Sequence, residues 1–410
     1  MERNNVKNFW LTLSVSAITF GAAVAASRVS VFFQFLTLNA LLVTVLVGRR
    51  EAVFSTLMIS IATLVFLNVT QTHDMLLKEG VAVAVHNAAA LVVILLLKNP
   101  YYSRFRMVWG SMIPVMFAAV LAACASALLR INSGFEWSAL VLDGAWTLAG
   151  GAVGIFFAIA IMPFYELVFK VWTNFKTAEM CSFHQPLLKE LAEKAPGTFN
   201  HSLAVGNLAE ACAVAIGENP FMARAAAYYH DIGKIDAPGF FAENQSGRNP
   251  HDDMIPEISV GMIKKHTSQG VERLRSVGMP EIIVSAANEH HGTTPVMFFY
   301  LKAQGMTEGK LKSDAYCYDA PKPRSKIAAI IMITDTIEAA TRAAGIMDAE
   351  TLDTFIYNII MDKVSRGQFD ECDITLKDLD KIRSVLKKAI PSIHHKRVQY
   401  QNQDELKEEK

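Results

Sequence analysis

The chain has 410 residues, of which 52% are hydrophobic and 19% are charged, and its mean hydropathy is +0.26. This composition is too apolar for an ordinary soluble protein, and the length allows two domains. The formal net charge is zero, so no field of the whole molecule attracts a nucleic-acid polymer. Five scattered cysteines without a Cys-x-x-Cys spacing argue against a zinc-thiolate site.

The apolar residues are concentrated at the start of the chain, and residues 1–170 are predicted to form a polytopic transmembrane domain. The uncharged stretches there are long enough, or nearly so, to cross a hydrocarbon layer of about 30 Å as helices. We expect about six spans, at 9–27, 29–47, 52–69, 80–97, 107–129 and in a stretch that ends near 169. That last stretch is too long for one simple crossing, and Gly150, Gly151 and Gly154 suggest a break or a short interfacial helix in it.

Lysines and arginines lie at alternate ends of these spans. Arg49, Arg50 and Lys170 fall on one side, whereas the opposite loops carry little more than Arg28 and Lys78. The positive-inside rule therefore predicts a multi-pass protein of the inner (cytoplasmic) cell membrane, with the lipid bilayer as a partner. Both termini and everything after residue 170 are then expected in the cytoplasm.

Two ionisable residues, His86 and Asp143, lie within the apolar half. They could belong to a proton or substrate path through the membrane. The sequence favours simpler roles, namely a hydrogen-bonded helix contact for His86 and an interfacial position for Asp143.

The pattern changes to mixed charge after residue 170. Residues 171–196 are predicted to form a juxtamembrane linker helix, which either passes position changes to the next domain or simply connects it. Prolines at first-turn positions and glycines just past helix ends then repeat without alternating apolar and polar residues. We therefore predict an all-α fold, in which the membrane helices are followed by an all-α cytoplasmic domain at 197–395 and a polar tail at 396–410.

A set of histidines and aspartates in this second half points to metal binding. The candidate ligands are His201, His230, Asp231, His266, His290, His291 and Asp335. His201 stands at the head of a predicted helix, His230 and His290 end others, and His266 precedes a polar turn. Five imidazoles and two carboxylates exceed what one tetrahedral zinc ion needs. They suit two octahedral first-row metals with Asp231 as the bridge.

The charge of such a centre favours an anionic substrate. Two divalent ions and two carboxylates leave about +2 in a partly dry pocket, which would hold a phosphate diester and activate a bridging water as hydroxide. Lys234 could neutralise a substrate phosphate, and the alternative is a solvated lysine. Arg342 could clamp a phosphate, or it could pair with Glu338 on the same helix face. No separate organic cofactor is implied.

Several segments together resemble a known family. The order His201, His230-Asp231 and Asp335 resembles the HD-domain metallophosphohydrolases, and His230-Asp-Ile-Gly-Lys234 gives the HDIG variant. Three further segments resemble the seven-transmembrane HD subfamily: Ala195-Pro-Gly-Thr-Phe-Asn-His-Ser202, Glu289-His-His-Gly-Thr293 and Thr334-Asp-Thr-Ile-Glu-Ala-Ala-Thr-Arg342. The resemblance implies hydrolysis of cyclic di-AMP to pApA by a di-iron or di-manganese centre, whose ligands would be the seven residues given above.

Two departures from the family leave alternatives open. Members usually carry a large extracytoplasmic domain after the first span, but here only Ser27-Arg28 separates the first two apolar runs, so that sensor is expected to be missing. The sequence after His290 also lacks the Gly-Tyr-Pro signature of the related enzymes that cleave cyclic di-GMP. Cyclic di-GMP, another nucleotide substrate, a membrane receptor that only binds a nucleotide, and a homodimer all stay open.

Overall fold

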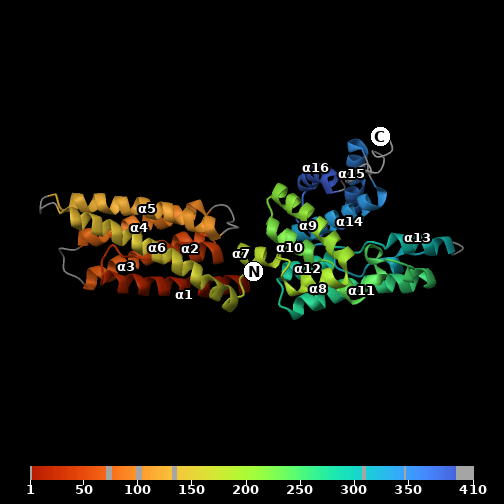
Figure 1. The fold of residues 1–410 in the computed structure, drawn as a ribbon, viewed down its shortest axis with the longest axis horizontal. Helices are drawn as coiled ribbons and strands as arrows, with labels where there is room; N and C mark the ends of the chain where they lie inside the picture. The colour runs from red at the N-terminus through yellow and green to blue at the C-terminus, as the bar shows by residue number, and fades with distance from the viewer. Residues whose placement is uncertain are drawn as a thin grey trace, which may run out of the picture. The chain divides into compact units, whose positions relative to one another are not determined.

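The computed structural model describes residues 2–70, 76–97, 104–131, 136–306, 311–345 and 348–393. Within these ranges every regular element is a helix, apart from one isolated bridge between Pro295 and Cys317. The chain divides into two compact units, Met1–Lys176 and Thr177–Lys410. The predicted fold class, a helical membrane domain followed by an all-α domain, is confirmed (Figure 1). The predicted polar tail, 396–410, lies outside the described residues.

The first unit is a bundle of apolar helices. They are α1 (Glu2–Ser27), α2 (Leu36–Leu46), α3 (Arg49–Thr70), α4 (Leu76–Leu96), α5 (Arg104–Leu129) and α6 (Trp137–Val168). All except α2 are long and apolar enough to cross a membrane. Large apolar side chains such as Phe54 and Phe117, each 67% exposed, cover their outer faces, as expected for contact with lipid.

The stretch predicted as a second helical span, 29–47, differs in the structure. Its helix, α2, has only 11 residues, which at 1.5 Å per residue is about 16 Å long and too short to span a bilayer. Residues 28–35 before it are not helical. Hydropathy alone could not distinguish a membrane-spanning helix from a short helix buried inside the bundle. Helix α2 is buried on nearly all sides and is therefore as apolar as a true span.

Side-chain hydrogen bonds satisfy backbone carbonyls of this non-helical stretch. His86 Nε2 donates to the Phe32 carbonyl at 2.9 Å, and Gln34 Nε2 donates to the Val31 carbonyl at 3.1 Å. Such bonds are required because irregular backbone at membrane depth finds no water there. Asp143 accepts a hydrogen bond from Ser126 at 2.6 Å and pairs with Arg130 at 3.1 Å. The contacts of His86 and Asp143 therefore agree with structural roles for both.

The glycines of α6 mark close packing, so the predicted break in this helix is wrong. The helix is continuous from Trp137 to Val168. A Cβ atom at Gly150 would lie 2.6 Å from the Gln34 carbonyl oxygen, and one at Gly154 would lie 2.4 Å from Thr37 Oγ1. At Gly151 it would lie 2.3 Å from Val115 Cγ1. The glycines thus let the non-helical stretch, α2 and α5 approach α6.

We expect Gly150→Ala to destabilise the membrane unit. The added methyl group would meet the backbone of Gln34, which cannot move aside as a flexible side chain can, and overpacking of this kind costs about 1–3 kcal/mol. Gly21→Ala in α1 is the matched control because nothing lies within 4 Å of its added Cβ. Thermal unfolding of the full chain in detergent would measure both. Equal unfolding midpoints for the two variants would contradict this account of α6.

Ten longer helices follow α6 within the described residues, and the first of them, α7, crosses the boundary into the second unit. They are α7 (Asn174–Met180), α8 (Pro186–Lys194), α9 (Pro196–Ile216), α10 (Pro220–Tyr229), α11 (Pro256–Ser276), α12 (Glu281–Glu289), α13 (Met297–Met306), α14 (Lys326–Ala344), α15 (Ala349–Ser365) and α16 (Leu376–Ile393). The predicted linker region thus holds two short helices, α7 and α8, instead of one. Proline stands in the first turn of α8, α9, α10 and α11.

Helices α9, α10, α12 and α14 pack together at the centre of this unit. Helix α10 is rich in alanine, and Ala223, Ala225 and Ala226 are completely buried, so neighbouring helices can approach it closely. A chain of short 3-10 turns follows α10, namely η2 (Ile232–Asp236), η3 (Pro238–Phe240), η4 (Ala242–Asn244) and η5 (Pro250–Asp253). The junction between α10 and η2 carries His230 and Asp231, at the point where α11 also approaches.

Candidate metal centre

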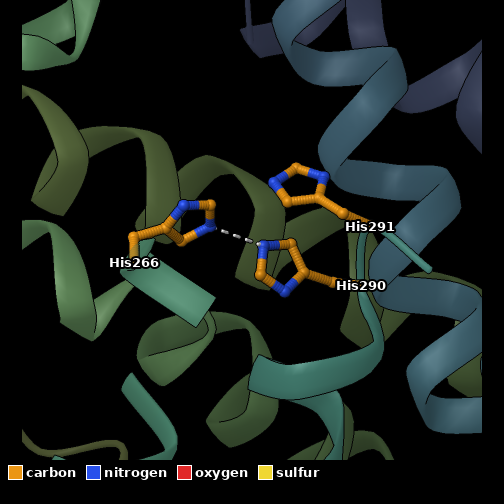
Figure 2. Close-up of side chains that lie close together, drawn as sticks. All are labelled: His266, His290 and His291. Atoms are coloured by element: carbon orange, nitrogen blue, oxygen red, sulfur yellow. Dashed lines mark hydrogen bonds between the residues drawn. The ribbon is translucent and has the colours of Figure 1, made fainter. Parts of the chain in front are cut away.

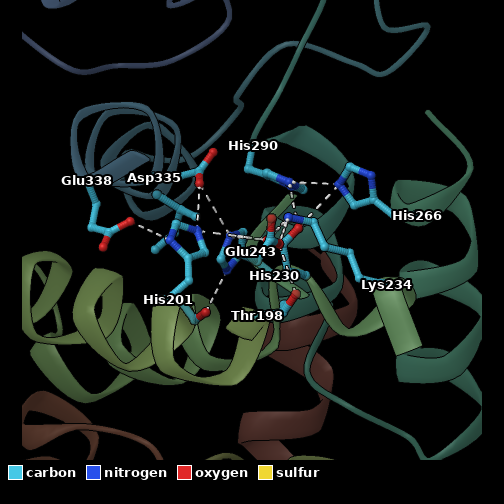
Figure 3. Close-up of polar contacts among 12 residues, drawn as sticks. Thr198, His201, His230, Lys234, Glu243, His266, His290, Asp335 and Glu338 are labelled. Atoms are coloured by element: carbon cyan, nitrogen blue, oxygen red, sulfur yellow. Dashed lines mark hydrogen bonds and ion pairs between the residues drawn. The ribbon is translucent and has the colours of Figure 1, made fainter. Parts of the chain in front are cut away.

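The helices of the second unit bring the seven predicted ligands into one cluster. His201 lies in the second turn of α9, His230 caps the end of α10, and Asp231 precedes η2. His290 caps α12 and Asp335 lies within α14 (Figure 3). His266, predicted to precede a turn, lies instead in the middle of α11. Six of the seven are at most 8% exposed, and His291 keeps about a fifth of its side chain exposed.

The ligand atoms fall into two groups that share Asp231. One group is His266, His290 and His291, whose rings converge in Figure 2. The other is His201, His230 and Asp335. In each group the candidate ligand atoms lie within 4.8 Å of one another, which is the spacing expected for ligands of a common ion.

Asp231 turns one oxygen toward each group. Its Oδ2 lies 3.2 Å from His230 Nε2 and 3.9 Å from His201 Nε2. Its Oδ1 lies 3.3 Å from His266 Nε2 and 3.6 Å from His290 Nε2. Two ligands at right angles, each about 2.1 Å from an ion, are about 3.0 Å apart. The positions of the two oxygens therefore suit a carboxylate that bridges two ions.

Backbone carbonyls fix the tautomer of three imidazoles. In each, Nδ1 donates to the carbonyl oxygen three residues earlier: His230 to Ala227 at 2.7 Å, His266 to Ile263 at 2.6 Å, and His290 to Ala287 at 2.9 Å. A carbonyl oxygen only accepts hydrogen bonds, so a neutral ring must carry its lone pair on Nε2. The Nε2 atoms of His266 and His290 face each other at 3.3 Å, and a cation would relieve the repulsion of their lone pairs.

The electrostatics of the cluster suit metal binding at neutral pH. Burial lowers the pKa of His266 to about 3, which keeps its imidazole neutral. Burial would raise the pKa of the Asp231 carboxyl, but His230 and Lys234 outweigh it and hold that pKa well below its usual value. Burial would likewise lower the pKa of His230, but Asp231 and Asp335 raise it to about 10. The carboxylates thus favour positive charge at this position.

Two buried atoms of the cluster lack a hydrogen-bond partner, His230 Nε2 and Asp231 Oδ1. Buried polar atoms are normally satisfied, so unpaired ones that point into a ligand cluster suit an ion. Nitrogen and carboxylate oxygen are also the donors that first-row divalent metals accept. The residues present therefore fit two divalent ions.

Lys234 lies beside the shared carboxylate. Its Nζ is 2.7 Å from Asp231 Oδ2 and 2.8 Å from Glu243 Oε1, and it stands 4.8 Å from the centre of the Phe241 ring. Burial would lower the pKa of Lys234, but the two carboxylates raise it, so the amine stays charged. Glu243 also accepts a hydrogen bond from Thr198 Oγ1 at 2.9 Å. Lys234 therefore ties the turns after α10 to the cluster.

Arg342 and Tyr318 complete the surroundings. The Arg342 guanidinium pairs with Glu338, four residues earlier in α14. The Tyr318 ring stacks on His291 with centroids 4.2 Å apart, a contact that the sequence did not predict. A pocket of about 510 Å³ opens onto the cluster. Its lining includes His201, Lys234, Phe241, His291, Tyr318 and Arg342.

Comparison with known proteins places this cluster in a described domain. The family model "HD domain" matches residues 198–340. The chain is 39% identical over 269 residues to "Cyclic-di-AMP phosphodiesterase PgpH" of Bacillus subtilis, covering 65% of this chain and 37% of the relative. It is 41% identical over 276 residues to the protein of the same name from Listeria monocytogenes, covering 67% and 38%. The chain thus spans less than two fifths of the length of these relatives.

A solved structure matches the second half of the chain. It is the crystal structure of the L. monocytogenes PgpH HD domain in complex with cyclic di-AMP. The sequence identity is 45%, the TM-score is 0.50, and the match covers 53% of this chain and all of the other.

Proposed function

Residues 198–340 belong to the HD domain family, and from this premise we propose that the chain is an integral-membrane, metal-dependent phosphodiesterase that hydrolyses cyclic di-AMP to pApA. The observation that carries the proposal is the cluster itself. Seven buried or half-buried ligand side chains from five helices and a turn converge beside a pocket, in a region 45% identical to a domain solved with cyclic di-AMP.

The proposed centre holds two divalent ions, Mn²⁺ or Fe²⁺, on His201, His230, Asp231, His266, His290, His291 and Asp335. When bound, these ions supply an activated water nucleophile and stabilise negative charge at phosphorus. The chain's own residues position the substrate. Lys234 and Arg342 line the pocket and bring positive charge to the phosphates, and Asp231 holds the two groups of ligands in register.

The membrane half fits this proposal. Five apolar helices anchor the chain in a bilayer, and the lysines and arginines noted above favour a cytoplasmic position for both termini and for the HD domain. This topology needs an even number of crossings, so the proposal includes a sixth, formed by residues 28–35 together with α2. The domain limits 1–170, 171–196 and 197–395 are part of the proposal. The enzyme would then act on a cytoplasmic second messenger and control its level.

The test is turnover by the full chain in detergent, loaded separately with Mn²⁺ and with Fe²⁺. We expect cyclic di-AMP to be converted to pApA, with much slower turnover of cyclic di-GMP, as read by chromatography of the products. The metal-free chain is the control and should be inactive. If neither dinucleotide is hydrolysed although two metal ions are bound per chain, the proposal is wrong and a nucleotide receptor becomes the better account.

A further inference from the structure

Glu338 is a buried carboxylate that contacts the outer side of the metal cluster. It is completely buried in α14, and its Oε2 lies 2.5 Å from Nδ1 of His201. The other ring nitrogen of His201, Nε2, lies 3.0 Å from Asp335 Oδ1. Figure 3 shows the imidazole of His201 between the two carboxylates. Glu338 therefore holds the ring by the nitrogen that does not face the ligands.

This support differs from that of three other imidazoles in the cluster. The Nδ1 atoms of His230, His266 and His290 donate to carbonyls of their own helices. A carbonyl is a neutral acceptor, whereas a carboxylate makes a charge-assisted and stronger hydrogen bond. A carboxylate behind a ligand imidazole also raises its basicity and fixes its orientation. Of these four rings, only that of His201 receives this support from a side chain.

The charge of Glu338 is itself compensated. A buried carboxylate without a partner is costly, but Arg342 pairs with its second oxygen, Oε1, and keeps 44% of its own side chain exposed. Asp335, Glu338 and Arg342 follow one another at spacings of three and four residues, which places them on one face of α14. One helix thus supplies a ligand, a support for a second ligand and the counter-charge.

We propose that Glu338 is a positioning residue that makes the two metal positions unequal. It strengthens the position formed by His201, His230 and Asp335 relative to that formed by His266, His290 and His291. The inference rests on the proposed function only in requiring two divalent ions, and it is independent of the substrate. Loss of a partner that supports a ligand imidazole lowers metal affinity by about 10–100-fold, and here we expect the loss at one position only.

The experiment titrates the metal-free full chain in detergent with Mn²⁺, and electron paramagnetic resonance measures free ions and coupled pairs. Wild type should bind two ions. In Glu338→Gln the amide oxygen still accepts from Nδ1, so one ion should bind normally and the other about 10-fold more weakly. In Glu338→Ala the affinity for the more weakly bound ion should fall by about 100-fold. At a Mn²⁺ concentration that just fills both positions of wild type and gives coupled pairs, both variants should show isolated ions instead.

Glu289→Gln is the matched control. Glu289 is also buried and directly precedes His290, but its Oε2 accepts from the backbone N–H of Arg324 at 2.9 Å. The Glu289→Gln variant should bind two ions as wild type does. Circular dichroism of the metal-free variants checks folding, and if Glu338→Ala does not fold, the isosteric Gln variant decides.

Equal weakening of both ions in Glu338→Gln, or no weakening, would overturn the inference, as would wild type that binds fewer than two ions. A wild type that binds two ions but does not hydrolyse cyclic di-AMP would refute the proposed substrate alone.

Discussion

Replacing Asp231 by alanine is expected to abolish hydrolysis of cyclic di-AMP, because both groups of ligands depend on this carboxylate. Its two oxygens lie 3.2 Å from His230 Nε2 and 3.3 Å from His266 Nε2. Metal ions supply several kcal/mol of transition-state stabilisation, and about 4 kcal/mol corresponds to about 10³-fold in rate. We therefore expect turnover to fall by at least about 10³-fold and bound metal to fall below two ions per chain.

The measurement pairs turnover with metal content after dialysis. Asp380→Ala, the same change at an exposed aspartate on α16, is the control and should leave both values unchanged. A variant at Asp231 that still binds two ions and retains wild-type turnover would remove the bridging role assigned to this residue.

Gly233→Ala is expected to have the next largest effect, because the glycine lies against the backbone of α11. An added Cβ would be 2.0 Å from the carbonyl oxygen of His266 and 2.6 Å from the amide nitrogen of Gly270. Neither atom belongs to a flexible side chain, so α11 itself must shift. Overpacking of this kind costs about 1–3 kcal/mol in stability. A displacement of about 1 Å in a positioned group can also cost about 10²-fold in rate.

This prediction requires unfolding, Mn²⁺ binding and turnover to be measured on one preparation. Gly239→Ala is the matched control, six residues later in the same series of turns, because nothing lies within 4 Å of its added Cβ. We expect Gly233→Ala to lose stability and about 10²-fold in turnover, while the control keeps both. Wild-type turnover in Gly233→Ala would mean that His266 does not need its present position.

The sequence predicted the all-α fold because helix ends are marked locally. The proline that opens α10 and the glycine that ends α9, Gly217, are both visible in the sequence, and the structure places Gly217 in the left-handed region. The histidines could be recognised as candidate ligands because several of them lie at the predicted ends of helices. The structure brings the candidate ligands together, and their binding of metal stays a prediction.

What the sequence could not show are contacts between distant segments. The Thr-Ser-Gln-Gly run after His266 suggested a turn, yet α11 continues through it, and Gly270 packs there against Gly233. The spacing of Glu338 from Asp335 was visible, but its partner His201 lies 137 residues away. The glycines of α6 suggested a break or a short interfacial helix, because nothing local reveals which segment approaches them.

The non-helical stretch before α2 also constrains how the membrane half is made. Its carbonyls at Val31 and Phe32 accept hydrogen bonds from the side chains of Gln34 and of His86 in α4. Its backbone at Gln34 packs closely against Gly150 in α6. A nascent chain that has only reached α2 has neither His86 nor Gly150, and the 11-residue helix is too short to hold itself across a bilayer. We therefore expect this stretch and α2 to settle late, after more than a hundred further residues have been synthesised, so that assembly of the bundle would not follow the order of its helices.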